Sequence, residues 1–270
     1  MDLKNNFWKD YPELEKELVQ VQQLMKSHVT IKKSDVKSAI FDIFNAGGKM
    51  LRPAYLLLFS GFTDLSESER LALAASVEMM HTATLVHDDV IDHADTRRGV
   101  ATLSAKYGPE IAVYAGDYLF IAVFRLMSEH SLELSNLTKN IDSIERLLGG
   151  ELGQLNHHFN LQQTLDDYIE NISAKTGELF ALSASVAPLI SKNNTLTKRA
   201  YKIGMNIGIS FQIMDDYLDY ASTAQTLGKP VLEDIKQGIY SAPVLFALQE
   251  NNALVSELIK NEKFDEVYDF

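Results

Sequence analysis

The spacing of the apolar residues constrains the fold of this chain more than any other feature. Apolar side chains recur mostly every three or four positions, which places them on one face of an α-helix, and strict alternation is nearly absent. Only six prolines interrupt the 270 residues. We therefore predict an all-α fold without a sheet, in one domain over residues 1–270, with long helices around a central space. The expected helices are Glu13–Met25, Asp35–Ala46, Glu67–His87, Glu110–Met127, Ile141–Phe159, Leu165–Ser185 and Lys198–Ala221.

Two acidic motifs of the same pattern lie on these helices, and each follows an apolar segment. Residues four apart share one helical face, about 5–6 Å from each other, so Asp88 and Asp92 can direct their carboxylates to one point. A single copy would be readily explained as a solvated acidic face or a chance match, but two copies are harder to explain that way. The motifs are Asp88-Asp89-Val90-Ile91-Asp92 and Asp215-Asp216-Tyr217-Leu218-Asp219.

Apolar surroundings favour a cation at these motifs, because carboxylates there repel one another and lose solvation. Oxygen-only ligands suit Mg²⁺, which keeps several waters and shares phosphate oxygens. The chain has no cysteine, which disfavours zinc. A histidine-led zinc site stays open as the less favoured alternative, since His81, His87 and His93 lie near the first motif.

Charge and composition narrow the class of partner. A net charge of -12 disfavours nucleic acid and anionic membranes, since both attract basic surfaces. The longest apolar stretches, around Tyr118–Met127 and Leu179–Ile190, are too short to span a bilayer, and the charged N-terminus has no signal core. We expect a cytoplasmic protein without stable membrane insertion.

Basic residues recur beside both acidic motifs, although the chain as a whole is acidic. A diphosphate bound through carboxylates and Mg²⁺ also needs cations on its remaining oxygens. Each candidate could by itself be a solvated surface charge, but their recurrence favours an anion-binding site. The candidates are Lys49 and Arg52 after Gly47-Gly48, Arg97 and Arg98 after the first motif, Lys175 before Thr176-Gly177, and Lys229 after the second motif.

With these motifs in this order, the sequence resembles the trans-isoprenyl diphosphate synthases of the polyprenyl synthetase family, above all the medium- and long-chain members. The resemblance implies the isoprenoid synthase fold, a helical bundle around a deep apolar tunnel, and usually a homodimer. Family members usually continue beyond the region that matches Pro243, so we expect a domain that is short at its C-terminus. The segments that carry the resemblance are GGKMLRP, HTATLVHDDVIDHADTRRG, YAGDYLF, GGELGQL, AKTGELF, FQIMDDYLD and GKPVLEDIKQG.

The resemblance also implies roles for single residues. Three Mg²⁺ ions are expected, two at the first motif and one at the second, held by Asp88, Asp89, Asp92, Asp215, Asp216 and Asp219. The allylic diphosphate would contact Arg97, Lys175 and Lys229. Isopentenyl diphosphate would contact Lys49, Arg52, His81 and Arg98. The residues expected to act in catalysis are Lys175, Lys229, and Thr176 and Gln212, which would steady the developing cation.

The implied reaction is a head-to-tail condensation of isopentenyl diphosphate with an allylic prenyl diphosphate. Mg²⁺ and basic residues neutralise the charge on the leaving diphosphate, so that the allylic carbon–oxygen bond ionises. The double bond of isopentenyl diphosphate, held close and oriented, then attacks the cation. A proton is lost afterwards, and the departing diphosphate is the expected acceptor.

Small residues one helical turn before the first motif indicate a long product. Short-chain synthases of this family tend to carry a bulky aromatic residue there, whereas this chain has Ala83 and Thr84, with Met80 further along the helix. We expect hexaprenyl to octaprenyl products, for a quinone side chain. The alternative is that these residues are small only because helices approach closely there.

Three other functions stay open. A short-chain farnesyl or geranylgeranyl synthase would differ only in its tunnel. A terpene cyclase or head-to-head condensing enzyme would not need the pocket at Lys49 and Arg52. A non-catalytic isoprenoid-binding subunit would be expected to have lost aspartates, yet both motifs are intact. If a small regulatory subunit forms a heteromer with this chain, this chain would be the catalytic partner.

Overall fold

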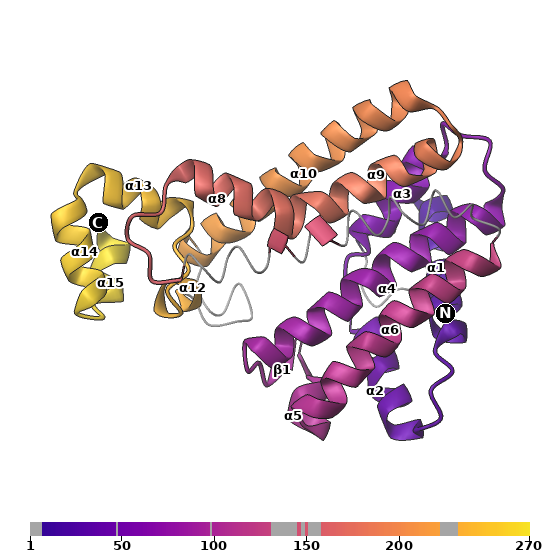
Figure 1. Cartoon of the computed structure of the whole chain (residues 1–270), viewed down its shortest axis with the longest axis horizontal. Coiled ribbons are helices and arrows are strands. Elements are labelled where there is room, and N and C mark those ends of the chain that lie inside the picture. Colours follow the sequence, from indigo (N-terminus) through magenta and orange to yellow (C-terminus); the bar gives the residue numbers. More distant parts are fainter. Residues whose placement is uncertain are drawn as a thin grey trace. The chain divides into compact units, whose positions relative to one another are not determined.

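The computed structural model describes residues 7–46, 48–97, 99–130, 145–146, 149–150, 158–221 and 232–270, and these residues are predominantly helical (Figure 1). Their contacts group into two compact units. The first unit takes its residues from 1–140 and 182–201, and the second from 141–181 and 202–270. The expectation of a single domain stays a prediction.

The elements follow one another as helices, with one short strand pair. In chain order they are α1 (Pro12–His28), α2 (Ser34–Asn45), α3 (Leu51–Ser60), α4 (Glu67–Ile91), β1 (Thr96–Arg97), β2 (Val100–Ala101), α5 (Leu103–Tyr107), α6 (Pro109–Glu129), α8 (Leu165–Ile172), the π-helix η1 (Ser173–Gly177), α9 (Glu178–Ile190), α10 (Asn194–Ala221), α12 (Glu233–Lys236), α13 (Ala242–Glu250), α14 (Asn252–Lys260) and α15 (Phe264–Asp269).

The expected helical class is confirmed, and α1, α2, α4, α6 and α10 confirm five expected helices with ends that differ by a few residues. The expected helix Leu165–Ser185 is divided into α8, η1 and α9. The expected helix Ile141–Phe159 lies mostly outside the described residues. The short helices α5 and α12 to α15 were not predicted, because so few turns leave little periodic pattern in the sequence.

In the first unit, α4 packs against α1, α3 and α6. It begins at a capping box, in which the Ser66 hydroxyl accepts from the Glu69 N–H at 3.3 Å and the Glu69 carboxylate accepts from the Ser66 N–H at 2.9 Å. Small buried residues such as Ala75 and Ala83 allow neighbouring helices to approach closely. The helix runs from this capped start to Ile91, within the first acidic motif.

A two-stranded antiparallel pair follows α4, with Thr96 opposite Ala101 and Arg97 opposite Val100. Gly99 between the strands has a φ of +75°, which glycine adopts without steric cost. The prediction that the chain has no sheet was therefore wrong in this detail. Strands of two residues are too short to leave an alternating pattern in the sequence.

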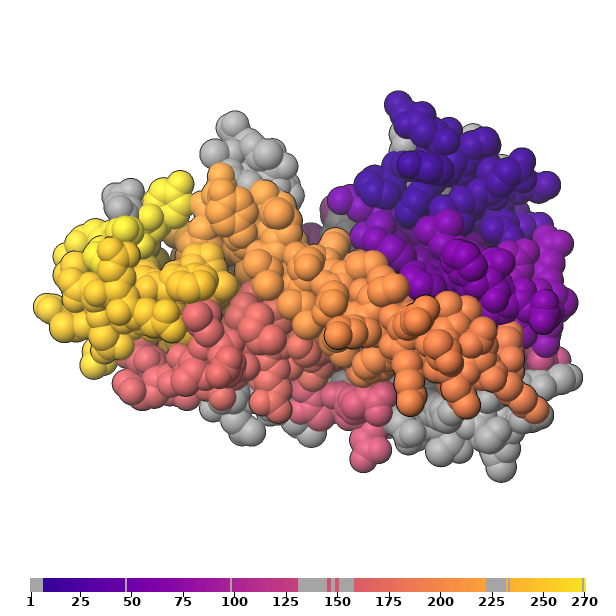
Figure 2. Space-filling model, turned by 90° about the horizontal axis from the view of Figure 1, so that it is seen from above, coloured from indigo at the N-terminus to yellow at the C-terminus, as the bar shows by residue number. Residues whose placement is uncertain are grey.

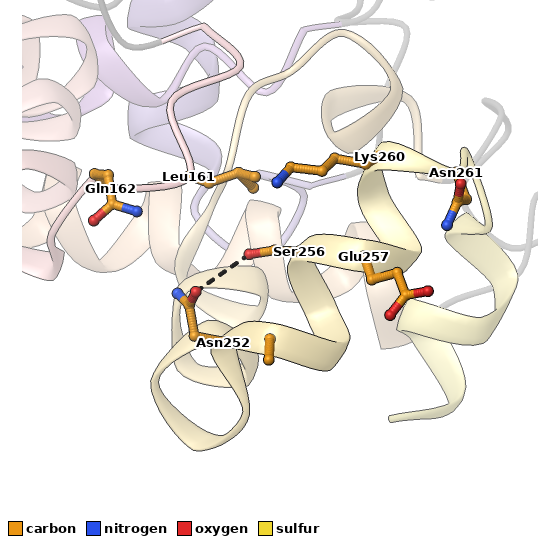
Figure 3. A pocket seen from close by; sticks show the side chains of 8 residues that line it. Leu161, Gln162, Asn252, Ser256, Glu257, Lys260 and Asn261 are labelled. Carbon is orange, nitrogen blue, oxygen red and sulfur yellow. Dashed lines mark hydrogen bonds between the residues drawn. The ribbon is translucent and has the colours of Figure 1, made fainter.

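The second unit has a core of its own, in which α8 packs with the helices that follow α10. Tyr168 and Ile172 of α8 are buried there together with Tyr240 and Val244. A cavity of about 480 Å³ opens beside this core, between the chain before α8 and helix α14 (Figure 3). Its lining includes none of the residues expected to bind substrate or metal; it consists of Leu161, Gln162, Asn252, Ala253, Ser256, Glu257, Lys260 and Asn261.

Within the described part of the chain, α6 is the one helix long and apolar enough to cross a membrane. The apolar part of this helix is longer than the predicted stretch Tyr118–Met127, because the segment Ile111–Ala115 on the N-terminal side of Asp117 is also apolar. Leu119 and Leu126 are among the residues of α6 that are buried, and α6 packs against α4. A core helix of a soluble protein can have the same length and apolar composition as a helix that spans a membrane. The cytoplasmic location and the lack of membrane insertion stay predictions.

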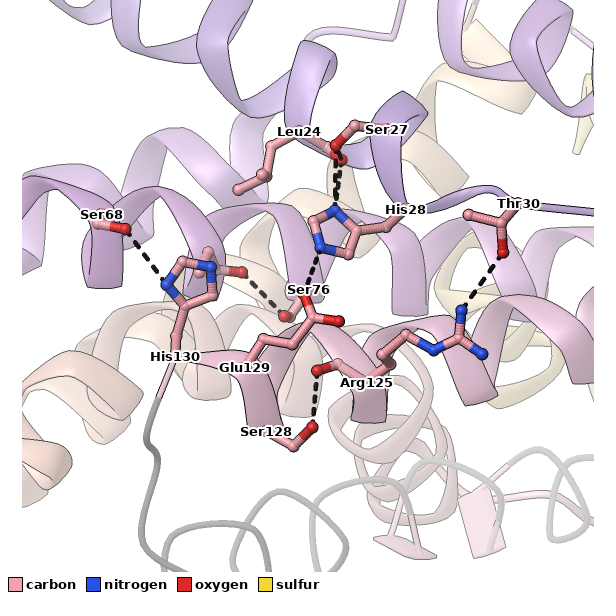
Figure 4. A network of polar contacts seen from close by, with 11 residues as sticks. Leu24, Ser27, His28, Thr30, Ser68, Ser76, Arg125, Ser128, Glu129 and His130 are labelled. Carbon is pink, nitrogen blue, oxygen red and sulfur yellow. Dashed lines mark hydrogen bonds and ion pairs between the residues drawn. The ribbon is translucent and has the colours of Figure 1, made fainter.

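Polar contacts hold the C-terminal end of α6 in place within the first unit (Figure 4). His28 Nε2, at the end of α1, lies 3.0 Å from Glu129 Oε2. Ser68 Oγ, in the first turn of α4, lies 3.2 Å from His130 Nδ1. These contacts tie α6 to both α1 and α4, so the register between α4 and α6 is fixed at this end.

Candidate active site

The first acidic motif lies at the C-terminal end of α4, where the helix dipole is negative and the last turn has no basic residue. Asp88 is half-buried and Asp92 is exposed, whereas Asp89 is buried, with 3% of its surface exposed. The Asp89 carboxylate accepts a hydrogen bond from Arg97 Nε at 2.6 Å. The structure therefore distinguishes Asp89, which holds an arginine, from Asp88 and Asp92, whose charge at this helix end favours a cation.

The donors at this helix end fit Mg²⁺. In the part of the chain that the structure describes, no three histidine, aspartate or glutamate side chains gather into a complete metal site. Mg²⁺ is usually held by one or two carboxylates together with phosphate oxygens and water. Asp88 and Asp92 can supply such carboxylates, and a bound diphosphate would supply the phosphate oxygens.

His87, next to Asp88, joins α4 to α6. Its Nε2 lies 3.2 Å from the Val113 carbonyl oxygen and 3.3 Å from Asp117 Oδ1. Gly116 makes this approach possible, because a Cβ at that position would lie 2.3 Å from His87 Nε2. The contact fixes the α4 backbone immediately before the first acidic motif.

The turn before α3 is held by aromatic residues from the N-terminal segment. Trp8 Nε1 donates to the Lys49 carbonyl oxygen at 2.6 Å, and Lys49 Nζ lies 5.4 Å from the centre of the Phe7 ring. Met50, the N-cap of α3, has a φ of +52°, which is uncommon for a residue other than glycine. The indole bond holds the turn next to this strained residue. Trp8 was not among the predicted site residues, because its partner is 41 positions away in the sequence.

Two residues expected to bind isopentenyl diphosphate are in contact. Arg52 Nη1, in the first turn of α3, lies 3.1 Å from His81 Nε2 on α4. A guanidinium has only donors, so His81 accepts through Nε2 and carries its proton on Nδ1. The packing of α3 on α4 thus orients the Arg52 side chain. Arg98, expected in the same pocket, lies outside the described residues.

The residues expected to set product length all lie on α4. Ala83 and Met80 are buried, with 0% and 2% of their surface exposed, and Thr84 is half-buried. The Thr84 hydroxyl donates to the His81 carbonyl oxygen at 2.9 Å. Thr84 is four residues before Asp88 and therefore shares its helical face. Their role in a tunnel stays a prediction.

The second acidic motif lies on α10, where Asp215 is exposed while Asp216 and Asp219 are buried, with 6% and 4% of their surface exposed. Asp216 accepts at both oxygens: from Tyr168 Oη at 2.6 Å and from Gln212 Nε2 at 2.7 Å. Burial raises the pKa of Asp216, and these two hydrogen bonds act in the opposite direction. Asp216 is therefore held by its neighbours within the second unit.

The π-helix η1 contains Lys175 and Thr176, where the sequence indicated an interrupted helix. The Thr176 hydroxyl donates to Gln212 Oε1 at 2.7 Å, which connects η1 to α10. Two glycines permit this close approach, because a Cβ on Gly208 would lie 2.7 Å from the Cα of Gly177. Single-turn π-helices of this kind are frequent at functional sites. Thr176 and Gln212, both expected in catalysis, are thus brought together.

Glu178, the first residue of α9, forms an ion pair that the sequence analysis did not anticipate. Only 2% of its surface is exposed, and its Oε1 accepts from Arg146 Nε at 2.9 Å and from Arg146 Nη2 at 2.6 Å. Nothing in the sequence relates the two residues, which are 32 positions apart. Lys175 is half-buried three residues before this pair. Lys229, the other lysine expected in catalysis, lies outside the described residues.

The chain is similar to several known proteins. The chain is 38% identical to solanesyl-diphosphate synthase 2, chloroplastic, from Oryza sativa subsp. japonica, over 91% of this chain and 62% of that protein. It is 38% identical to heptaprenyl diphosphate synthase component 2 from Bacillus subtilis, over 80% of this chain and 62% of that protein. A crystal structure of geranylgeranyl pyrophosphate synthase from Lactobacillus brevis matches with a TM-score of 0.90 and 36% identity, over 97% of this chain and 84% of that one.

The fold is therefore that of the isoprenoid synthases, as the sequence predicted. The polyprenyl synthetase family model matches residues 33–269. This chain belongs to the polyprenyl synthetase family, a family of prenyltransferases. It spans 62% of the length of each of the two relatives named above.

Proposed function

We propose that this chain catalyses the Mg²⁺-dependent, head-to-tail condensation of isopentenyl diphosphate with an allylic prenyl diphosphate, giving an all-trans polyprenyl diphosphate. The end of α4 carries the proposal: Asp88 and Asp92 lie at the negative end of a helix, and buried Asp89 holds Arg97 beside them. A diphosphate bound through Mg²⁺ needs carboxylates and a cationic side chain close together. Family membership supports the reaction class.

Mg²⁺ bound at the acidic motifs would neutralise the negative charge that develops on the departing diphosphate. Arg97 would share this task, because Asp89 fixes its guanidinium in advance and further N–H donors of the group can contact the diphosphate. Lys49 and Arg52 would bind the diphosphate of the second substrate and so orient its double bond. His81 holds the Arg52 guanidinium for this purpose.

The amide of Gln212 has a fixed orientation. Its oxygen accepts from Thr176, and its nitrogen donates to Asp216. A dipole that is already oriented stabilises developing charge without reorganisation during the reaction. In the proposed reaction this dipole steadies the allylic cation, as the family resemblance implies for Gln212 and Thr176.

We propose a medium or long product, hexaprenyl to octaprenyl, for a quinone side chain. The small side chain of Ala83 on buried α4 supports a product of this class, as does the relative named for a heptaprenyl product. The relative named for a solanesyl product, which is longer than octaprenyl, supports the long end of the class. A geranylgeranyl synthase among the similar structures supports the alternative of a short-chain synthase. Measurement of the product length would distinguish the medium- or long-chain synthase from the short-chain alternative.

The proposed assembly is a homodimer. Apolar side chains at Val113, Tyr114 and Ile121 are 40%, 75% and 57% exposed along α6, and such a face favours a protein partner. The name "component 2" of the Bacillus subtilis relative supports a heteromer with a second subunit as the alternative. The proposed number of Mg²⁺ ions remains three per active site.

Purified protein, isopentenyl diphosphate and a panel of allylic primers test the proposal directly. We expect consumption of isopentenyl diphosphate that requires both a primer and Mg²⁺ and stops when EDTA is added. Reverse-phase analysis of the dephosphorylated products then gives the chain length. Binding of prenyl diphosphates without consumption, with and without added subunits, would contradict a catalytic role.

A further inference from the structure

Tyr168 lies outside both acidic motifs, yet its hydroxyl reaches into the second one. Tyr168 Oη donates to Asp216 Oδ2 at 2.6 Å, from a residue 48 positions earlier in the chain. Only 4% of the tyrosine surface is exposed. A phenol is protonated at neutral pH, so Tyr168 acts as the donor in this bond. This buried donor therefore constrains the orientation of the Asp216 carboxylate.

Helix α8 holds the tyrosine ring in a fixed place. The helix begins at a capping box, in which the Thr164 hydroxyl accepts from the Asp167 N–H at 3.1 Å and the Asp167 carboxylate accepts from the Thr164 N–H at 2.9 Å. One turn after Tyr168, Ile172 is buried in the same core. The hydroxyl position is thus set by packing within the second unit.

The hydrogen bond from Tyr168 orients two further side chains. With Oδ2 engaged by the phenol, Asp216 turns Oδ1 to Gln212 Nε2. The nitrogen of Gln212 therefore faces Asp216, and its oxygen faces the Thr176 hydroxyl. The Asp216 carboxylate, which only accepts, thus determines which way the Gln212 amide points, and Tyr168 fixes how that carboxylate is turned.

We propose that Tyr168 is a positioning residue for the second acidic motif. It holds the Asp216 carboxylate in one orientation, toward Gln212 and beside Asp215 and Asp219, the other aspartates of this motif. The proposal deepens the proposed function and rests on it. The expectation that Asp216 also binds metal stays a prediction, since a carboxylate oxygen that accepts one hydrogen bond keeps a further lone pair.

Tyr168→Phe is the test, since it removes the hydroxyl and keeps the ring. Removing a partner of this kind typically lowers metal affinity or activity about 10- to 100-fold. We expect the Mg²⁺ concentration for half-maximal activity to rise and kcat to fall within that range. The KM for isopentenyl diphosphate should change less than about twofold, because Tyr168, Asp216 and Gln212 are not among the residues expected to bind that substrate.

Tyr240→Phe is the matched control. Tyr240 lies in the same buried core, and its pKa is raised by burial alone. A second readout avoids turnover: the rise in Tm on adding Mg²⁺ with inorganic diphosphate, which reports binding to the folded state. Wild type and Tyr240→Phe should show the same rise, and Tyr168→Phe a clearly smaller one.

The possible outcomes distinguish failure of the proposed function from failure of the positioning role of Tyr168. A wild type that consumes no isopentenyl diphosphate, yet shows the Tm rise, refutes the proposed function and leaves the positioning role to be decided by the Tm data. Tyr168→Phe that matches Tyr240→Phe in Mg²⁺ response, kcat and Tm rise overturns the positioning role. Should Tyr168→Phe fail to fold, Asp216→Leu is used instead. It removes both oxygens that accept from Tyr168 and Gln212, so wild-type behaviour in this variant also overturns the proposal.

Discussion

The substitution Gly208→Ala tests whether the close approach of α10 to η1 sets the geometry around Gln212. A Cβ at position 208 would lie 2.7 Å from the Gly177 Cα and 3.1 Å from the Cβ and Cδ2 of Phe180. The nearest obstacle is backbone, which cannot rotate away as the end of a flexible side chain can. The two segments must therefore separate by several tenths of an ångström.

The expected cost follows from two opposing terms. Overpacking by a methyl group costs about 1–3 kcal/mol, and replacing glycine by alanine within a helix returns about 1 kcal/mol. The net loss of about 0–2 kcal/mol corresponds to a fall in Tm of up to about 8 °C for a chain of this size. Activity should fall further, about 10- to 100-fold, because the Thr176–Gln212 hydrogen bond, 2.7 Å long, joins the same two segments.

Gly149→Ala is the control, because a Cβ at position 149 would meet nothing within 4 Å in the described structure. The two variants and wild type would be compared by thermal unfolding and by consumption of isopentenyl diphosphate with an allylic primer. Gly149→Ala should match wild type in both. If Gly208→Ala also kept the wild-type Tm and rate, the close packing would not set the geometry around Gln212.

Three further predictions concern the first unit and the division of work between the motifs. Ala83→Phe should shorten the main product, because a phenyl ring would fill the expected tunnel beside α4; an unchanged product spectrum would contradict the position of that tunnel. Trp8→Phe removes the donor to the Lys49 carbonyl oxygen and should raise the KM for isopentenyl diphosphate about two- to tenfold, as expected for one hydrogen bond, with kcat little changed; a fall in kcat alone would be inconsistent with this role. Asp88→Ala should cost at least as much activity as Asp219→Ala at saturating Mg²⁺, and the reverse order in steady-state assays would show that the second motif carries more of the metal binding.

Much of the fold could be predicted because long helices leave a repeated pattern. The 25 residues of α4 and the 21 residues of α6 span several turns, so apolar residues at three- and four-residue spacing were visible in the sequence. Shorter elements were missed for the same reason: a strand of two residues or a helix of four has no period to detect. The π-helix was visible only as an interruption at Lys175 and Thr176, and its form required the structure.

The sequence by itself determined the class of fold, the family and the two acidic motifs, because each depends on residues close together along the chain. Only the tertiary structure showed how the aspartates within the motifs differ in burial and in hydrogen-bond partners. Asp89 and Asp216 have the same place in their motifs, yet one holds Arg97 eight residues away and the other is held by Tyr168, 48 residues away. The packing of the folded chain determines which side chain reaches each aspartate, and the spacing of residues within a motif does not predict these partners. Asp88 and Asp92 share a helical face by spacing alone, whereas the burial that separates Asp89 from them follows from contacts made across the first unit.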